Sequence, residues 1–199
     1  MKLKKNKLSY LLFLFLAMAC DTNFTPKPKA FNRIDLPPHK YQKLKDSSLP
    51  YHFQYSKIAL VIKDTTGNKK EKELYRIVHY PAFDCNIHLT YKPIKESIDT
   101  LNSYISEGYR LRDGHDKKAY GFDERYDTTD LGYQLAAFEL EGNVPSPFQF
   151  MVHDSTTHFL RGALYFQVAT KNDSLAPVIN YVKEDIYHMI NTIDWKNSQ

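Results

Sequence analysis

Residues 133–168 read YQLAAFELEGNVPSPFQFMVHDSTTHFLRGALYFQV, and this stretch decides the fold. It contains three runs rich in apolar and aromatic residues, 133–140, 147–153 and 159–168, which are typical of β-strands. Glu141-Gly142-Asn143 and Asp154-Ser155-Thr156 join the runs with turn-forming residues. Because links this short place successive strands side by side in opposite directions, we predict a three-stranded antiparallel meander.

Helical periodicity is present on both sides of the meander. Downstream, Asp173-Ser174 offers an N-cap, Pro177 lies in the first turn, and apolar residues follow one face at positions 178, 182, 186, 189 and 193. Upstream, apolar residues at positions 94–109 recur at three- and four-residue steps, which predicts an amphipathic helix that begins near Glu96 and is weakened by Gly108. We interpret the charged residues 110–130 as a loop with a short second helix.

Four more strands are predicted before the first helix, at residues 51–55, 59–62, 74–79 and 85–91, with an exposed turn at 64–72. The last of them alternates cleanly, with Cys85 and Ile87 on one face and Asn86 and His88 on the other. Strand runs with segregated helices predict an α+β fold, a single antiparallel sheet packed by helices. This order of elements resembles the PsbP/Mog1-like fold.

The amino terminus, MKLKKNKLSYLLFLFLAMAC, has the organisation of a secretory leader: lysines, a short apolar run and small residues before Cys20. The apolar run is too short to cross a bilayer, which takes about 20 residues. We predict a lipoprotein signal peptide at residues 1–19 and lipidation, with palmitate among the acyl chains, at Cys20. An ordinary signal peptide with a coincidental cysteine, or an uncleaved anchor, is the alternative.

Residues 20–49 are predicted to form a lipidated, extended arm, and residues 50–199 the α+β domain. The arm contains four prolines, and Pro50 follows directly; these residues disfavour helix and central strand, and the arm would lift the domain off the bilayer. Its apolar residues suggest that a later part of the arm packs along the domain or against a partner.

Composition excludes several classes of function. The chain has 27 basic residues, and removal of the four leader lysines leaves 23, which equals the number of acidic residues. The mature chain therefore has no net positive charge of the kind that nucleic-acid-binding domains carry. With Cys20 acylated, only Cys85 remains, and no intramolecular disulfide can form. Seven glycines and no phosphate-binding loop argue against a nucleotide cofactor.

The richest polar cluster is His153-Asp154-Ser155-Thr156-Thr157-His158, followed by Arg161. Ser155 could be a nucleophile activated by either histidine, but no GxSxG elbow surrounds it, and we expect a hydrogen-bonded Asx/Ser turn instead. We expect Arg161 to pair with an acid or to face solvent. His153 and His158 lack a third ligand and an HExxH motif, so no zinc site is predicted.

The remaining candidates are weaker. Asp123-Glu124 near His115 is interpreted as a solvated charge run rather than an acid and base. His79, Asp84 and His88 are close in sequence, but His88 alternates away from the face of Cys85, which we expect in the core. We therefore predict no catalytic residues, no metal and no cofactor, and expect that the protein is not an enzyme.

Several segments resemble the gliding-motility lipoprotein GldD family of the Bacteroidota: FTPKPKAFNRIDLP after Cys20, HLTYKPI, DSTTHFLRGALYFQV and NDSLAPVINYVKEDIYHMI. The resemblance extends over residues 24–195 and is weakest at 112–133. It implies an envelope lipoprotein required for surface gliding and linked to type IX secretion, without catalytic activity or cofactor, and with Cys20 as the lipidated residue. The membrane is left open, either the cell membrane or the outer membrane, facing the periplasm.

Three functions follow from these observations. The first is a non-enzymatic accessory component of the gliding motility and type IX secretion machinery, which holds other envelope proteins through exposed aromatic or strand-edge surface. The second is a periplasmic small-ligand or lipid-binding lipoprotein with an aromatic pocket wall. The third is an envelope hydrolase that uses Ser155 or the nearby histidines.

Overall fold

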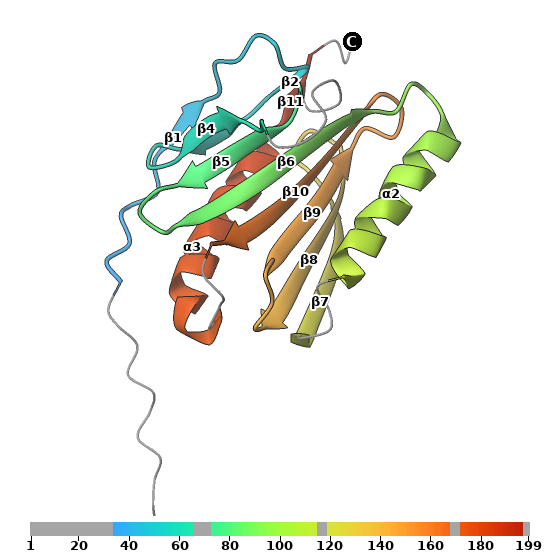
Figure 1. Cartoon of the computed structure of the whole chain (residues 1–199). Helices are drawn as coiled ribbons and strands as arrows, with labels where there is room; N and C mark the ends of the chain where they lie inside the picture. Colours follow the sequence, from blue (N-terminus) through green and yellow to red (C-terminus); the bar gives the residue numbers. More distant parts are fainter. Residues whose placement is uncertain (1–33, 66–72, 115–118, 168–171, 197–199) are drawn as a thin grey trace, which may run out of the picture. The chain divides into compact units, whose positions relative to one another are not determined.

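A seven-stranded antiparallel sheet organises the described part of the chain (Figure 1). The computed structural model describes residues 34–65, 73–114, 119–167 and 172–196. The predicted signal peptide, Cys20, the first part of the arm, His115 and most of the turn at 64–72 lie outside these residues. The strand order is β4-β5-β6-β10-β9-β8-β7, with β4 (Leu60–Lys63), β5 (Arg76–Tyr80), β6 (Cys85–Pro93), β7 (Ala119–Thr128), β8 (Gln134–Gly142), β9 (Phe148–His153) and β10 (His158–Phe166).

The predicted meander is present as β8, β9 and β10. In the antiparallel register, Gln134 of β8 lies opposite His153 of β9, which lies opposite Phe159 of β10. Strand β6 then pairs with the other side of β10 along its whole length. The predictions of an α+β fold and of an antiparallel sheet are therefore confirmed, but the sheet is not single, because the described residues also form two small two-stranded sheets.

The alternation of the strands separates two cores, one on each face of the sheet. Helix α3 (Asn172–Asn191) packs on one face, where its residues Val182 and Ile186 meet Phe148, Phe150 and Leu160. Helix α2 (Ile98–Asp113) packs on the opposite face, where the buried residues are Ile94, Leu101, Phe138, Leu140, Val144, Met151 and Phe159. Figure 1 shows the two helices on either side of the sheet.

The helix ends differ in part from the predicted ones. Helix α2 is capped by the Ser97 hydroxyl, which accepts a hydrogen bond from the amide of Thr100 at 3.2 Å. Gly108 does not weaken the helix, which continues to Asp113; a Cβ at Gly108 would lie 2.2 Å from the sulfur of Met151, so this glycine allows the close approach of α2 to β9. Helix α3 begins at Asn172, so the predicted cap at Asp173-Ser174 is wrong.

The loop and short helix predicted at residues 110–130 are also wrong. Helix α2 extends into this region, and residues 119–128 form β7, an edge strand paired with β8. A β-bulge between Ala119 and Gly121 disturbs its start. The alternation of β7 was hidden because most of its side chains are exposed on both faces, so polar and apolar residues do not segregate.

Residues 34–49, which the sequence assigns to the arm, lie against the domain. Strand β1 (Tyr41–Lys43) pairs with β3 (Gln54–Ser56), and Leu44 and Leu49 are buried in the core next to α3. A second small sheet joins β2 (Tyr51–His52) to β11 (Asp194–Trp195) near the carboxyl terminus. Both ends of the described chain are thus tied to the same side of the large sheet.

Candidate functional site

The His153–His158 segment is a structural turn. The Oδ1 atom of Asp154 accepts hydrogen bonds from the backbone amides of Thr156, Thr157 and His158 at 3.0, 2.7 and 2.8 Å. One carboxylate thereby satisfies three donors between β9 and β10, and the predicted Asx turn is confirmed.

The two histidines of this turn lie on opposite faces of the sheet. The hydroxyl of Ser155 is 3.4 Å from Nδ1 of His153, an exposed contact, and burial lowers the pKa of this histidine. His158 faces the other core, where its Nδ1 is 2.7 Å from the hydroxyl of Tyr91 and its ring stacks on Trp195. Within the described ranges, no carboxylate hydrogen-bonds to His153 to orient it, so this pair lacks the third group of a hydrolytic triad.

Arg161 has a different partner from the predicted acid. Its Nη2 donates to the amide oxygen of Gln149 at 2.6 Å, on the same face as α2. Burial lowers the pKa of Arg161, and the charge of Glu107 and a contact with Tyr165 offset part of that effect.

Asp123 and Glu124 do not form an acid–base pair, because they point to opposite faces of β7. Asp123 pairs with Arg125 at 2.9 Å in solvent, whereas Glu124 accepts from Arg112 at 3.2 Å and from Tyr109 at 3.1 Å.

The residues that lie near Cys85 in the sequence are also separated in the structure and form no common site. Cys85 is fully buried, as predicted, and burial raises the pKa of its thiol to about 12. His79 contacts the Asn86 side chain at 2.7 Å on the opposite face, while Asp84 lies in the turn between β5 and β6. Among the described side chains, no group of three or more His, Cys, Asp or Glu residues could hold a metal ion.

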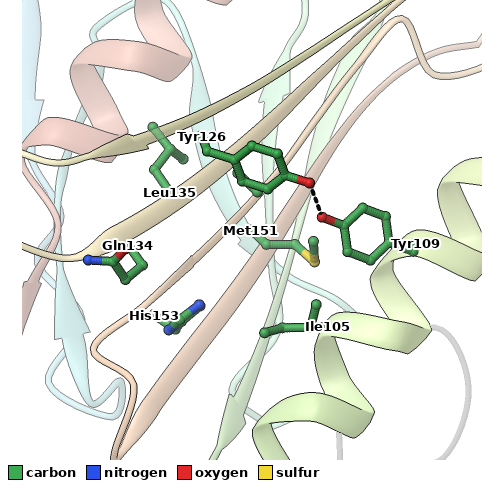
Figure 2. Close-up of a pocket in the computed structure, with 8 residues that line it drawn as sticks. Ile105, Tyr109, Tyr126, Gln134, Leu135, Met151 and His153 are labelled. Carbon is green, nitrogen blue, oxygen red and sulfur yellow. Dashed lines mark hydrogen bonds between the residues drawn. The ribbon is translucent and has the colours of Figure 1, made fainter.

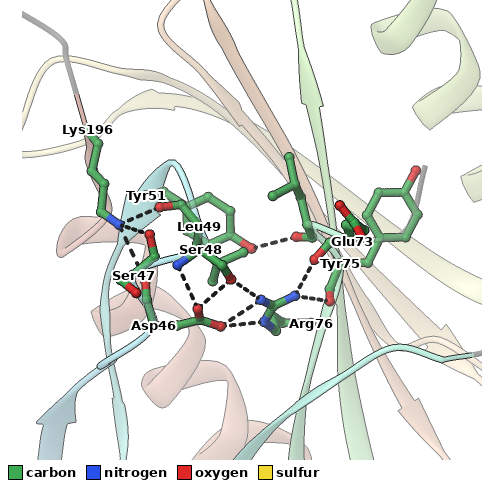
Figure 3. A network of polar contacts seen from close by, with 10 residues as sticks. Asp46, Ser47, Ser48, Leu49, Tyr51, Glu73, Tyr75, Arg76 and Lys196 are labelled. Carbon is green, nitrogen blue, oxygen red and sulfur yellow. Dashed lines mark hydrogen bonds and ion pairs between the residues drawn. The ribbon is translucent and has the colours of Figure 1, made fainter. Parts of the chain in front are cut away.

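A polar network that local patterns do not indicate joins both ends of the domain to β5 (Figure 3). The buried guanidinium of Arg76 donates to Oδ2 of Asp46 at 2.9 and 2.6 Å, to the Ser48 hydroxyl and to two backbone carbonyls. Burial opposes ionisation of Asp46, but hydrogen bonds from Ser48 and Arg76 outweigh it and lower the pKa of Asp46. Lys196 donates to the carbonyls of Ser47 and Leu49 at 3.1 and 2.6 Å. The network stabilises the fold.

A second network of this kind centres on Asp185 of α3, which is 2% exposed. Its carboxylate contacts Nδ1 of His39 at 2.7 Å and accepts from the hydroxyl of Tyr80 at 3.0 Å. The other ring nitrogen of His39 lies 2.9 Å from Glu184. These contacts hold residues before β1 against α3. No local sequence pattern indicates these contacts, because the partners are more than 100 residues apart.

A small pocket lies between α2 and strands β7, β8 and β9 (Figure 2). Its volume is about 160 Å³, and the Tyr109 and Tyr126 hydroxyls close one side at 2.5 Å from each other. Met151 and His153 also line the pocket. Sites for drug-sized ligands usually enclose about 300–1,000 Å³, so this pocket is small for a lipid or cofactor.

A larger and more open groove of about 580 Å³ lies between the residues that precede β5, the end of β6 and α2. Three tyrosines and two lysines line most of it: Tyr75, Tyr91, Tyr104, Lys92 and Lys95. The ammonium of Lys92 lies 4.8 Å from the centre of the Tyr104 ring and pairs with Glu107.

The sheet surface beside α2 is a candidate for contacts with another protein. The register of β4, β5 and β6 places six side chains on one face, which we call the open face: Leu60, Ile62, Ile77, His79, Asn86 and His88. Helix α2 packs over β9 and β10 on this side. Leu60 and Ile62 are 55% and 47% exposed, which is unusual for large aliphatic residues on adjacent positions of one face.

Residues 21–195 match the model of a protein family described as gliding motility lipoprotein GldD. No curated protein matches this chain in sequence. Among the helices of the described residues, none combines the length and apolar character that a membrane crossing requires.

Two solved structures are similar in fold at low identity. The solution structure of cyanobacterial PsbP (CyanoP) from Synechocystis sp. PCC 6803 has 12% identity and a TM-score of 0.47, covering 82% of this chain and 97% of that chain. The Ran-binding protein Mog1p of Saccharomyces cerevisiae has 7% identity and a TM-score of 0.44, covering 79% and 96%. Both TM-scores are below 0.5, so the closer assignment to a PsbP/Mog1-like fold stays a prediction.

Proposed function

Because this chain belongs to the gliding motility lipoprotein GldD family, we propose that it is a non-enzymatic, lipid-anchored accessory component of the gliding motility and type IX secretion machinery. In this proposal a signal peptide directs the chain to the envelope, acylation of Cys20 anchors it, and the domain faces the periplasm. Two or more acyl chains would give stable anchoring, since each buried CH₂ contributes about 0.8 kcal/mol.

The observation that carries the proposal is the open face. Side chains with chemical capacity are engaged in structural contacts: Asp154 in its turn, Arg76 with Asp46, and His158 with Tyr91. Leu60 and Ile62, in contrast, expose aliphatic surface on a rigid sheet. Such an arrangement suits the binding of another protein better than the turnover of a substrate.

The test is to replace Leu60 and Ile62 together by Glu in the full-length protein in its native host. We expect the variant to reach the membrane at normal level while colony spreading and type IX secretion fall, because charge in the centre of an apolar contact is costly. Leu131→Glu is the matched control, since Leu131 is 52% exposed in the turn between β7 and β8. Spreading and secretion that survive the double substitution would contradict the proposal.

A ligand-binding lipoprotein is the second candidate, favoured by the volume and the tyrosine lining of the groove between the residues before β5, the end of β6 and α2. Native mass spectrometry of protein extracted gently from host membranes would then detect a bound small molecule, and Tyr104→Ala would release it. Protein that carries no molecule beyond its own acyl chains would eliminate this candidate.

A further inference from the structure

Strand β7 is the last strand at one edge of the large sheet, and within the described residues no strand pairs with its outer side. β7 has 10 residues and pairs with β8 on its inner side, whereas β4, the strand at the other edge of the sheet, has four. Edge strands expose unpaired backbone amides and carbonyls, and proteins commonly keep such strands short or covered. A long regular edge such as β7 is a template for another strand.

The side chains of β7 are arranged with different chemistry on its two faces. Asp123 and Arg125 lie opposite Glu139 and Ala137 of β8, on the face of α3, and are 54% and 66% exposed. Phe122 and Tyr126 lie on the face of α2 and are 46% and 69% exposed. The bulge is confined to the start of the strand, so the segment from Phe122 to Thr128 is regular.

Symmetry restricts how two copies of β7 could pair. A two-fold axis that relates antiparallel strands of one sheet is perpendicular to the sheet, so each residue pairs with one of the same face, and the centre falls on a residue. Two registers then pair all but one residue of the strand, one centred on Asp123 and one on Glu124. The first opposes Asp123 to Asp123, which is repulsive.

The register centred on Glu124 is complementary. It places Asp123 of each copy opposite Arg125 of the other, twice per dimer, and Phe122 opposite Tyr126, also twice. Asp123 and Arg125 already pair within the strand at 2.9 Å, so two copies would form a ring of alternating charges. Glu124 meets its own copy at the centre, where Arg112 and the Tyr109 hydroxyl already bind its carboxylate.

We propose that two copies of this chain associate edge to edge through β7, in the register that pairs Asp123 with Arg125, and so join their two sheets into one continuous sheet. This interface is separate from the open face on β4–β6, so a dimer would present two open faces to other proteins. Anchoring both copies to one membrane would raise their effective concentration and favour the contact.

The experiment uses the full-length protein with two different affinity tags, co-expressed in a bacterium that lacks the gliding machinery, so that co-purification from mild detergent reports direct contact. Wild-type copies are expected to co-purify. Asp123→Arg in both copies, or Arg125→Asp in both copies, should reduce the recovered partner roughly tenfold, because each change makes two attractive cross-strand pairs repulsive.

The mixed pair decides the register. A copy with Asp123→Arg and a copy with Arg125→Asp oppose Arg to Asp at both positions, so recovery should return to the wild-type level. Asp127→Arg is the matched control: it makes the same charge change on the same strand, but Asp127 lies opposite Gly121 in the proposed register and recovery should not change. Wild-type copies that do not co-purify, a mixed pair that is not rescued, or an equal loss with Asp127→Arg would each overturn the proposal.

Discussion

Asp46→Asn tests whether the charge pair between Asp46 and Arg76 holds the segment before β2 to the domain. The Arg76 side chain is 5% exposed and that of Asp46 28%, so the substitution leaves a buried guanidinium without its counter-charge. Removing one partner of a buried pair typically costs about 3–5 kcal/mol. Because Arg76 keeps Ser48 and two carbonyls as acceptors, we expect the low end, about 3 kcal/mol, or roughly 10 °C in Tm for a domain of this size.

The assay is urea unfolding of the purified protein, followed by tryptophan fluorescence, at several pH values. The pKa of Asp46 is lowered in the folded state, so its stabilisation is complete above the unfolded value of about 3.9 and is lost as pH falls through the folded pKa. The difference between wild type and Asp46→Asn should therefore be constant from pH 5 to 8 and shrink only below about pH 4. Asp113→Asn is the control, because Asp113 is 56% exposed in its pair with Arg112 and its loss should cost about 0.5 kcal/mol or less. A free energy of unfolding that is equal for Asp46→Asn and wild type would refute the reasoning.

Two further substitutions and one labelling experiment test the packing. Gly162→Ala should cost about 3 kcal/mol in urea unfolding, because the new Cβ would lie 2.0 Å from the ring of the fully buried Phe150; an unchanged midpoint would show that β9 and β10 are not packed in this way. Gly108→Ala should cost less than about 1 kcal/mol, since the flexible side chain of Met151 can move and alanine favours helix by about 0.8–1 kcal/mol; a loss as large as that of Gly162→Ala would contradict this. Cys85 should resist a thiol reagent at pH 8 until the protein is unfolded by urea, because the thiol is buried and its pKa is about 12; rapid labelling of native protein would place it at the surface instead.

The elements predicted well are those whose neighbours in sequence are also their neighbours in space. The meander of β8, β9 and β10 follows from apolar runs and two turns, and the Asp154 turn satisfies its own backbone. Strand β7 was not predicted, because its side chains show no alternation between a buried and an exposed face. As an edge strand with exposed side chains, such as Asp123 and Tyr126, it has no buried face to impose a period of two.

The candidate sites show the same difference between local features, which the sequence predicts, and contacts of distant residues, which it does not. The absence of a local catalytic motif was visible in the sequence, and the expectation of a non-enzymatic protein remains a prediction. The contacts of Asp46 with Arg76 and of His39 with Asp185 could not be predicted, because nothing in the pattern around one partner identifies a residue 30 or 146 positions away. Likewise, the apolar run at 59–62 predicts a strand but not the exposure of Leu60 and Ile62, which follows from the placement of α2 over β9 and β10.

The amino-acid sequence by itself determined the α+β class, the meander, the core face of α3 and the family, because periodicity and turn chemistry are local consequences of burying one side of a segment. Only the tertiary structure decided that β6 pairs with β10, that β7 forms the free edge, and that aliphatic side chains of β4 face solvent. Those outcomes depend on which distant segments of the chain pack together. The free energy that favours one arrangement is the sum of contacts throughout the core, so no single stretch of sequence reveals it.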